Sequence, residues 1–177
     1  TTTEAMAEFN ARMTRGSPLV GHEFDKELVV PESVWDFAKL SAPPIFRWLD
    51  DTGPVRQVLY RGEPYQGKPT DVFAYYATPG TLAGDPSLDK NLPALVLVHG
   101  GGDRAFRDWV TFWAGKGYAA IAMDLAGCGP NADGEYDKLH KPERLLRGGP
   151  SQDGKRKILD INLPLTDQWP YHAVANV

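Results

Sequence analysis

The residues with the clearest chemical potential are His99, Gly100, Gly101 and Gly102, which follow a continuous apolar run and precede a helical pattern. Glycines at such a corner let backbone N–H groups approach a ligand without hindrance from a Cβ atom, and the start of the following helix adds partial positive charge. The corner is therefore predicted to bind an anion. That anion is either permanent, as in a phosphate, or transient, as in the oxyanion of acyl transfer.

A permanent phosphate is favoured by one pattern. Gly100, Gly102 and Ala105 satisfy the relaxed dinucleotide fingerprint GxGxxA, and Asp124 closes the next apolar run where a ribose-binding acid would lie. Two facts weigh against it: the glycine run is the third strand-like segment in its region, and His99 is unusual at the mouth of a dinucleotide loop. A dinucleotide-binding module remains the alternative hypothesis.

The segments before the corner predict β-structure. The runs VRQVLYRG at 55–62 and DVFAYYATP at 71–79 are separated by the turn-rich stretch EPYQGKP, which predicts a hairpin or neighbouring antiparallel strands. The run ALVLVHGGG at 94–102 is continuous and rich in β-branched residues. It is the pattern of a central strand buried on both faces.

The segments after the corner complete a strand, helix, strand unit. Phe106, Trp109, Val110 and Trp113 occupy positions i, i+3, i+4 and i+7, which predicts a helix that packs through one apolar stripe and ends at the glycines that follow. YAAIAMD at 118–124 predicts a second buried strand. Together they predict a right-handed crossover between two parallel strands, and thus an α/β fold.

The chain is predicted to divide into two parts. Residues 1–54 lack a regular pattern and form an N-terminal extension that packs on the core, whereas residues 55–177 form a partial α/β domain. Within that domain, residues 125–168 exceed an ordinary connection and predict a long insertion beside a site. The segment WPYHAVANV at 169–177 predicts the first turns of a helix, with Pro170 near its start.

The stretch VLVHGGGDRAFRDWVTFWAGKGYAAIAMDLAGCG resembles the third strand, oxyanion loop, first helix and fourth strand of the α/β-hydrolase superfamily. The nearest branches are acetylxylan-esterase-like proteins and dienelactone-hydrolase or prolyl-oligopeptidase-like proteins. The resemblance implies the N-terminal part of an α/β-hydrolase sheet, with antiparallel first strands, then parallel strands with a crossover helix, in a three-layer sandwich.

The same resemblance implies a serine-dependent carboxylic-ester hydrolase, for which acetylated carbohydrate is one candidate substrate. Gly101 and Gly102 are then expected to donate backbone N–H groups to the oxyanion or to shape the loop that donates them. His99 is expected to support the loop and not to act as the base. Gly100 and Asp103 are candidate substrate-binding residues. The resemblance implies no organic cofactor and no metal.

The nucleophile of such an enzyme is not predicted within this sequence. An α/β-hydrolase serine lies on a GxSxG elbow, and no serine here has that context: Ser151 has Gly149 before it, but Asp153 stands in place of the second glycine. Cys128 follows the wrong strand. The chain is therefore expected to end before the elbow, as a fragment or as one half of a pair whose second chain supplies the C-terminal half. A non-catalytic interaction fragment is a further alternative.

Composition narrows the remaining classes. A formal net charge of −4 and scattered positive residues argue against nucleic-acid binding, and no apolar run reaches the length of a membrane span. The single cysteine cannot form a disulfide within the chain. The compartment is not predicted by the residues; the family resemblance alone favours a periplasmic or secreted protein.

Overall fold

The computed structural model describes residues 34–100, 104–130, 143–151 and 162–177. The chain divides into two units, Thr1–Val34 and Trp35–Val177, and nearly all described residues belong to the second. The predictions for Gly101, Gly102 and Asp103 lie outside the described residues.

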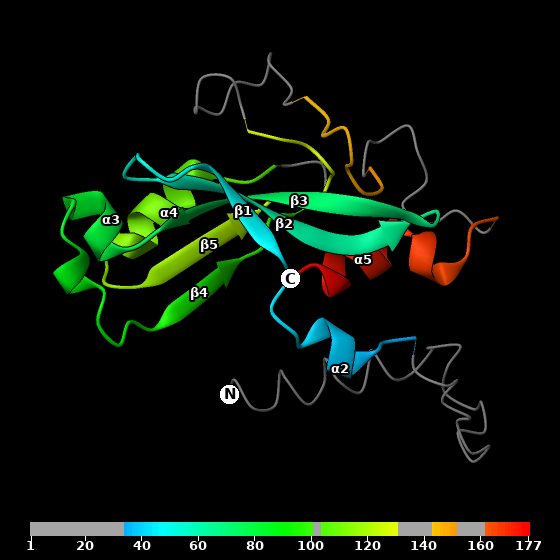
Figure 1. Ribbon diagram of the computed structural model, residues 1–177, viewed down its shortest axis with the longest axis horizontal. Coiled ribbons are helices and arrows are strands. Elements are labelled where there is room, and N and C mark those ends of the chain that lie inside the picture. The colour runs from blue at the N-terminus through cyan, green and yellow to red at the C-terminus, as the bar shows by residue number, and fades with distance from the viewer. Residues whose placement is uncertain (1–33, 101–103, 131–142, 152–161) are drawn as a thin grey trace, which may run out of the picture. The chain divides into compact units, whose positions relative to one another are not determined.

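The second unit is built on a five-stranded mixed sheet with the strand order β1-β2-β3-β5-β4. The strands are β1 (Phe46–Asp50), β2 (Arg56–Tyr65), β3 (Lys68–Ala77), β4 (Ala94–Leu97) and β5 (Ala119–Met123). The pairs β1–β2, β2–β3 and β3–β5 are antiparallel, and the pair β4–β5 is parallel. The prediction of antiparallel strands followed by a parallel pair is confirmed (Figure 1).

A two-residue turn joins β2 and β3 into the predicted hairpin. Gln66 and Gly67 lie between the strands with φ angles of 50° and 71°. Positive φ at both central residues is the type I′ arrangement, whose twist matches that of the flanking strands. The hairpin register pairs Leu59 with Phe73 and Arg61 with Asp71.

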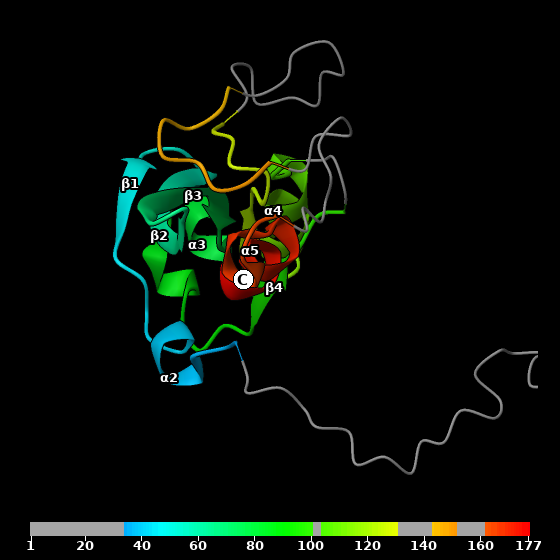
Figure 2. The same cartoon turned by 90° about the vertical axis from the view of Figure 1, so that its right-hand side faces the viewer.

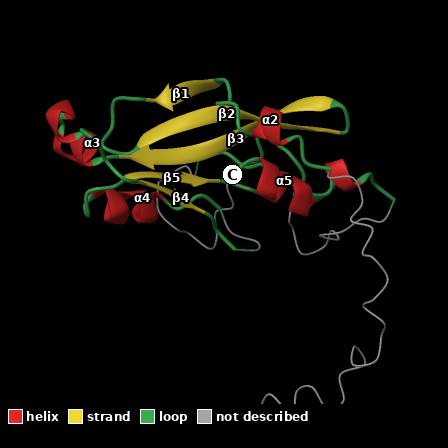
Figure 3. Cartoon of the chain, turned by 90° about the horizontal axis from the view of Figure 1, so that it is seen from below, coloured by secondary structure: helices red, strands yellow, loops and turns green. Residues whose placement is uncertain are grey.

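Short helices connect and cover the strands. They are α2 (Phe37–Leu40), α3 (Pro79–Ala83), α4 (Arg107–Ala114) and α5 (Trp169–Ala175), with 3₁₀ turns at Pro86–Leu88 and Leu165–Asp167. The helix α4 joins β4 to β5, as predicted, and α5 carries Pro170 in its first turn. Figures 1 and 3 show α4 and α5 toward opposite ends of the strands.

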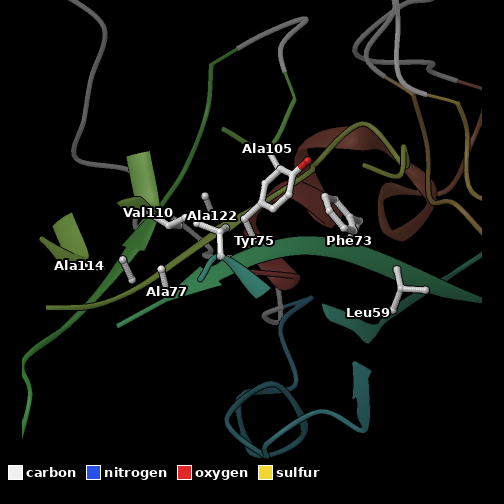
Figure 4. Close-up of a cluster of buried hydrophobic side chains, with 10 residues drawn as sticks. Leu59, Phe73, Tyr75, Ala77, Ala105, Val110, Ala114 and Ala122 are labelled. Atoms are coloured by element: carbon white, nitrogen blue, oxygen red, sulfur yellow. The ribbon is translucent and has the colours of Figure 1, made fainter. Parts of the chain in front are cut away.

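The two faces of the sheet bury separate apolar clusters. Phe73 of β3 packs with Val110 and Ala114 of α4 in the first cluster, of which Figure 4 shows ten side chains. Its neighbour Ala74 belongs to the second cluster, against which Trp169 of α5 packs. Because successive residues of a strand point to opposite faces, α4 and α5 pack on opposite faces of the sheet.

The predicted extension differs from the structure between residues 46 and 50. This segment forms β1, and Trp48 there pairs with Val58 of β2 and contacts the ring of Tyr76 on β3. The sequence FRWLD lacks a strict alternation of apolar and polar residues and so gave no strand signal. In the structure four of its five residues are exposed, so neither face of β1 is buried. The sheet therefore begins before residue 54.

The prediction that β4 is buried on both faces is wrong for the part of the chain that the structure describes. β4 lies at the edge of the sheet, beside β5 only. Val96 and Val98 are each 48% exposed. The apolar pattern was recognised, but no described strand pairs with the outer edge of β4.

The packing stripe predicted for α4 is correct only in part. Val110 is fully buried, but Trp109 is 38% exposed and stacks on Phe106. The helix begins at Arg107, so Phe106 is its N-cap residue and not part of a helical face. The buried stripe is formed instead by Val110 and Ala114, one turn apart.

Candidate functional site

The predicted corner lies where β4 and β5 end side by side. Since the two strands are parallel, their carboxyl ends share one edge of the sheet, which is where open α/β sheets place their ligands. His99 and Gly100 follow β4, and Asp124 follows β5. The candidate site is therefore framed by two loops, one after each strand.

His99 ties these two loops together. Its Nε2 accepts a hydrogen bond of 2.9 Å from the backbone N–H of Leu125, and its Nδ1 lies 2.7 Å from the carbonyl oxygen of Gly100. An amide can only donate and a carbonyl can only accept, so the ring is neutral with its proton on Nδ1. Both nitrogens are engaged and the side chain is buried. This arrangement suits a supporting residue and leaves no nitrogen free to act as a base.

Asp124 organises the turn after β5. Its Oδ1 accepts hydrogen bonds of 2.9 Å from the N–H of Ala126 and 2.7 Å from the N–H of Cys128. The side chain is only 2% exposed. Burial raises the pKa of Asp124, and the backbone amides oppose that shift. The carboxylate is thus committed to the fold of the turn.

Replacing Asp124 by Asn should remove one source of pH dependence. The pKa of Asp124 in the folded protein lies above the ordinary 3.8. Between the unfolded-state pKa and the folded-state pKa, the native protein therefore binds more protons than the unfolded chain. The free energy of unfolding consequently falls as the pH rises through this range. Asp124→Asn keeps an oxygen for the two amides. Relative to the parent, the variant should gain stability as the pH rises, which urea unfolding from about pH 4 to about pH 7 would measure. An unchanged difference over that range would contradict the assignment.

Part of the predicted insertion is built onto this turn. The N–H of Leu145 donates to the carbonyl of Gly127 at 3.0 Å, and the N–H of Gly129 donates to the carbonyl of Glu143 at 2.9 Å. Arg144 also donates to the carbonyl of Ala126 at 2.8 Å. Residues 143–149 therefore form a strap that holds the turn, and Figures 1 and 2 show this segment beside β3.

Cys128 lies in the same turn and is not set up as a nucleophile. Burial, reinforced by the charge of Asp124, raises the pKa of its thiol to about 11. At neutral pH the sulfur therefore carries its proton, and thiolate is the reactive form.

The dinucleotide alternative does not fit the geometry of the described residues. In that motif the glycine loop leads directly into the helix, whereas α4 begins only at Arg107, beyond Ala105. The acid of the motif must reach a ribose hydroxyl, but Asp124 is buried and bonded to two backbone amides.

His172 is a buried polar residue outside the predicted corner. It lies on α5 with 2% of its surface exposed, edge-on to the ring of Tyr65. By distance and angle, neither ring nitrogen has a hydrogen-bond partner among the residues that the structure describes. The sequence signal for its burial is the spacing of Trp169, His172 and Ala173, which occupy the i, i+3 and i+4 positions of one packed helix face. His172 is therefore a packing residue.

Replacing His172 by Phe should reduce acid sensitivity. Burial lowers the pKa of His172 from 6.5, so as the pH falls below that value the unfolded chain takes up a proton that the native state refuses, and stability is lost. The Phe variant keeps the ring and lacks this loss. At neutral pH it should be at least as stable as the parent, because the variant buries no polar ring nitrogens. Thermal unfolding at falling pH would check this; a variant that loses stability in parallel with the parent would contradict it.

The structure brings together only part of the predicted site. His99 and Gly100 are described, and a Cβ atom placed on Gly100 would meet no heavy atom within 4 Å, so the start of the loop is open.

No group of three or more metal-binding side chains occurs among the described residues. Within those same ranges, no helix has the length and apolar character to cross a bilayer.

Comparison with known proteins adds no relative. No protein-family model matches the chain, and no curated protein or solved structure shows significant similarity to it.

Proposed function

We propose that this chain is the oxyanion-loop portion of a serine-dependent carboxylic-ester hydrolase of the α/β-hydrolase type, with the N-terminal strands of a three-layer sandwich. Acetylated carbohydrate is the proposed substrate class. The observation that carries the proposal is the bridge through His99, which joins the loop after β4 to the turn after β5 and leaves Gly100 open.

The bridge matters because an oxyanion hole must be preorganised. Backbone donors stabilise the transition state only if they already point at the position where negative charge develops, and each can lower the barrier by about 3 to 4 kcal/mol. His99 fixes the carbonyl of Gly100, which belongs to the same peptide group as the N–H of Gly101. In the proposed enzyme, the N–H groups of Gly101 and Gly102 bind the oxyanion.

The edge position of β4 supports the second part of the proposal. This four-residue apolar strand, in which Val96 is half exposed, leaves unpaired backbone groups along its outer side among the described residues. We infer that a strand from polypeptide outside these residues pairs there, and that this polypeptide carries the nucleophilic serine, the acid and the histidine of the triad.

The chemistry then divides between the two parts. The serine attacks the ester carbonyl, the carbonyl oxygen becomes the oxyanion at Gly101 and Gly102, and loss of the alcohol leaves an acyl-enzyme that water hydrolyses. Asp124 and His99 act as positioning residues, because both are bonded to backbone groups around the site.

The test uses an affinity tag on this chain in the cells that make it. The recovered material should hydrolyse 4-nitrophenyl acetate, and a fluorophosphonate should label a serine outside the 177 residues. Gly102→Val in that material should lower kcat about a hundredfold. The matched control Lys116→Gln, at an exposed cation after α4, should leave kcat unchanged.

Two results would overturn the proposal. One is fluorophosphonate labelling of a serine within this chain, such as Ser151. The other is full activity of Gly102→Val. A saturable change in NADH or NADPH fluorescence would instead favour the dinucleotide alternative.

A further inference from the structure

A cavity of about 490 Å³ is lined by three arginines, and neither His99 nor Asp124 is among its lining residues. Arg47 comes from β1, Arg61 from β2 and Arg147 from the strap at 143–149. Among the described lining residues, the single acidic group is Asp71 of β3. Segments that are distant in the sequence thus bring three guanidinium groups to one place.

The sheet register explains why these side chains gather. Arg47 pairs with Leu59 across β1 and β2, and Arg61 pairs with Asp71 across β2 and β3. Paired residues, and residues two apart along a strand, share one face of a sheet. The strap adds Arg147 to that face, because its carbonyl accepts a 2.7 Å hydrogen bond from the N–H of Asp71.

The cavity carries surplus positive charge. Asp71 faces two of the arginines: its Oδ1 lies 3.5 Å from Nε of Arg61 and its Oδ2 lies 3.5 Å from Nε of Arg147. These distances exceed the roughly 2.8 Å of a strong charge-assisted hydrogen bond. Arg47 makes no ion pair with any described residue. The three guanidinium groups and one carboxylate of the described lining carry a formal charge of +2, in a chain whose net charge is −4.

The rest of the described lining is mostly apolar, and two of its aliphatic side chains are exposed. Ile45 is 81% exposed and Leu146 is fully exposed, while Leu59 is buried at the base. These two solvent-exposed aliphatic side chains and the neighbouring arginines form an amphipathic surface. A ligand that matches it has one negatively charged end and one apolar end.

We propose that this cavity binds an amphiphilic carboxylate, with the carboxylate between the guanidinium groups of Arg47 and Arg147 and the hydrocarbon chain along Ile45 and Leu146. The planar fork of a guanidinium matches a carboxylate in two parallel hydrogen bonds. The site does not depend on the proposed hydrolase activity, and binding changes no covalent bond.

The test is a calorimetric titration of the intact chain with sodium octanoate, 1-octanol, acetate and octyl phosphate. Octanoate should bind saturably and at least about tenfold more tightly than 1-octanol or acetate, since each lacks one half of the match. Octyl phosphate distinguishes a carboxylate site from a general anion site: binding tighter than octanoate would overturn the carboxylate assignment.

Two variants with opposite expected effects locate the site. Arg47 is exposed and has no ion pair within the described part of the chain, so Arg47→Gln should weaken octanoate binding about tenfold, the loss of one charge-assisted contact. Asp71→Asn removes the one negative group and should tighten binding. Lys116→Gln is the control for net charge and should change nothing. The proposal fails if octanoate binds no better than 1-octanol, or if Arg47→Gln and Lys116→Gln bind octanoate alike.

Discussion

The His99→Ala variant should lose about 3 kcal/mol of unfolding free energy, because two hydrogen bonds disappear and the buried N–H of Leu125 is left without an acceptor. The imidazole also fills space, since only 5% of it is exposed. The loss should be local as well as global: amide hydrogen exchange at Gly100 and Leu125 should accelerate more than at the sheet centre, for example at Tyr75. Urea unfolding and hydrogen exchange measure the two effects.

The control for this variant is His99→Gln. The amide oxygen of glutamine can reach the position of Nε2 and accept from Leu125, so at least half of the loss should be recovered. If Ala and Gln variants were equally stable, and no less stable than the parent, the bridge would not hold the two loops together.

The Gly148→Ala variant should be destabilised by about 3 kcal/mol or more, the scale of severe overpacking. A Cβ atom at Gly148 would collide with the backbone carbonyl of Gly127, which cannot turn away like a flexible side chain. The strap must then separate from the turn after β5, and its 3.0 Å hydrogen bond from Leu145 to Gly127 should weaken. Thermal unfolding would show a lower Tm, and protease cleavage should increase within 143–149.

Gly53→Ala is the matched control. A Cβ there would meet the carbonyl oxygen of Val55 at 3.5 Å, an ordinary contact. Both variants add one methyl group to the backbone, so only the packing differs. Equal Tm values for the two variants would mean that the strap does not pack on the turn as described.

Much of the fold could be predicted because its strongest signals are local. The hairpin of β2 and β3 has two strand-like runs around a Gln66–Gly67 turn, and α4 lies between two apolar runs. Alternation, helical spacing and turn residues act over a few positions, so the sequence shows them directly. The parallel pairing of β4 with β5 followed from the helix between them.

What could not be predicted depends on partners distant in the chain. β1 is a strand because β2 offers it an edge, and its own sequence lacks the alternating pattern. The edge position of β4 depends on which strands are present. The gathering of Arg47, Arg61 and Arg147 required both the register of three strands and the course of the strap. Single positions carry none of this information.

The candidate site divided in the same way. The type and spacing of His99 and the glycines predicted an anion-binding corner, and the position of His99 beside the loop was expected. The hydrogen bond between His99 and the N–H of Leu125 forms only when the ends of β4 and β5 meet. The hydrogen bonds that Asp124 accepts from the turn amides also depend on the folded turn. Asp124 looked like a ribose ligand in the sequence because a buried structural carboxylate and a binding carboxylate occupy the same place after a strand.

The most direct measurement is a ¹H–¹⁵N titration of the isotope-labelled chain with methylphosphonate, an anion that resembles the tetrahedral oxyanion. If the corner is arranged to meet developing negative charge, the amide protons of Gly101 and Gly102 should move downfield saturably, and His99→Ala should abolish the shift. If these amides keep their positions with the anion, or respond to NADH instead, then the loop is not an oxyanion hole and the hydrolase account is contradicted.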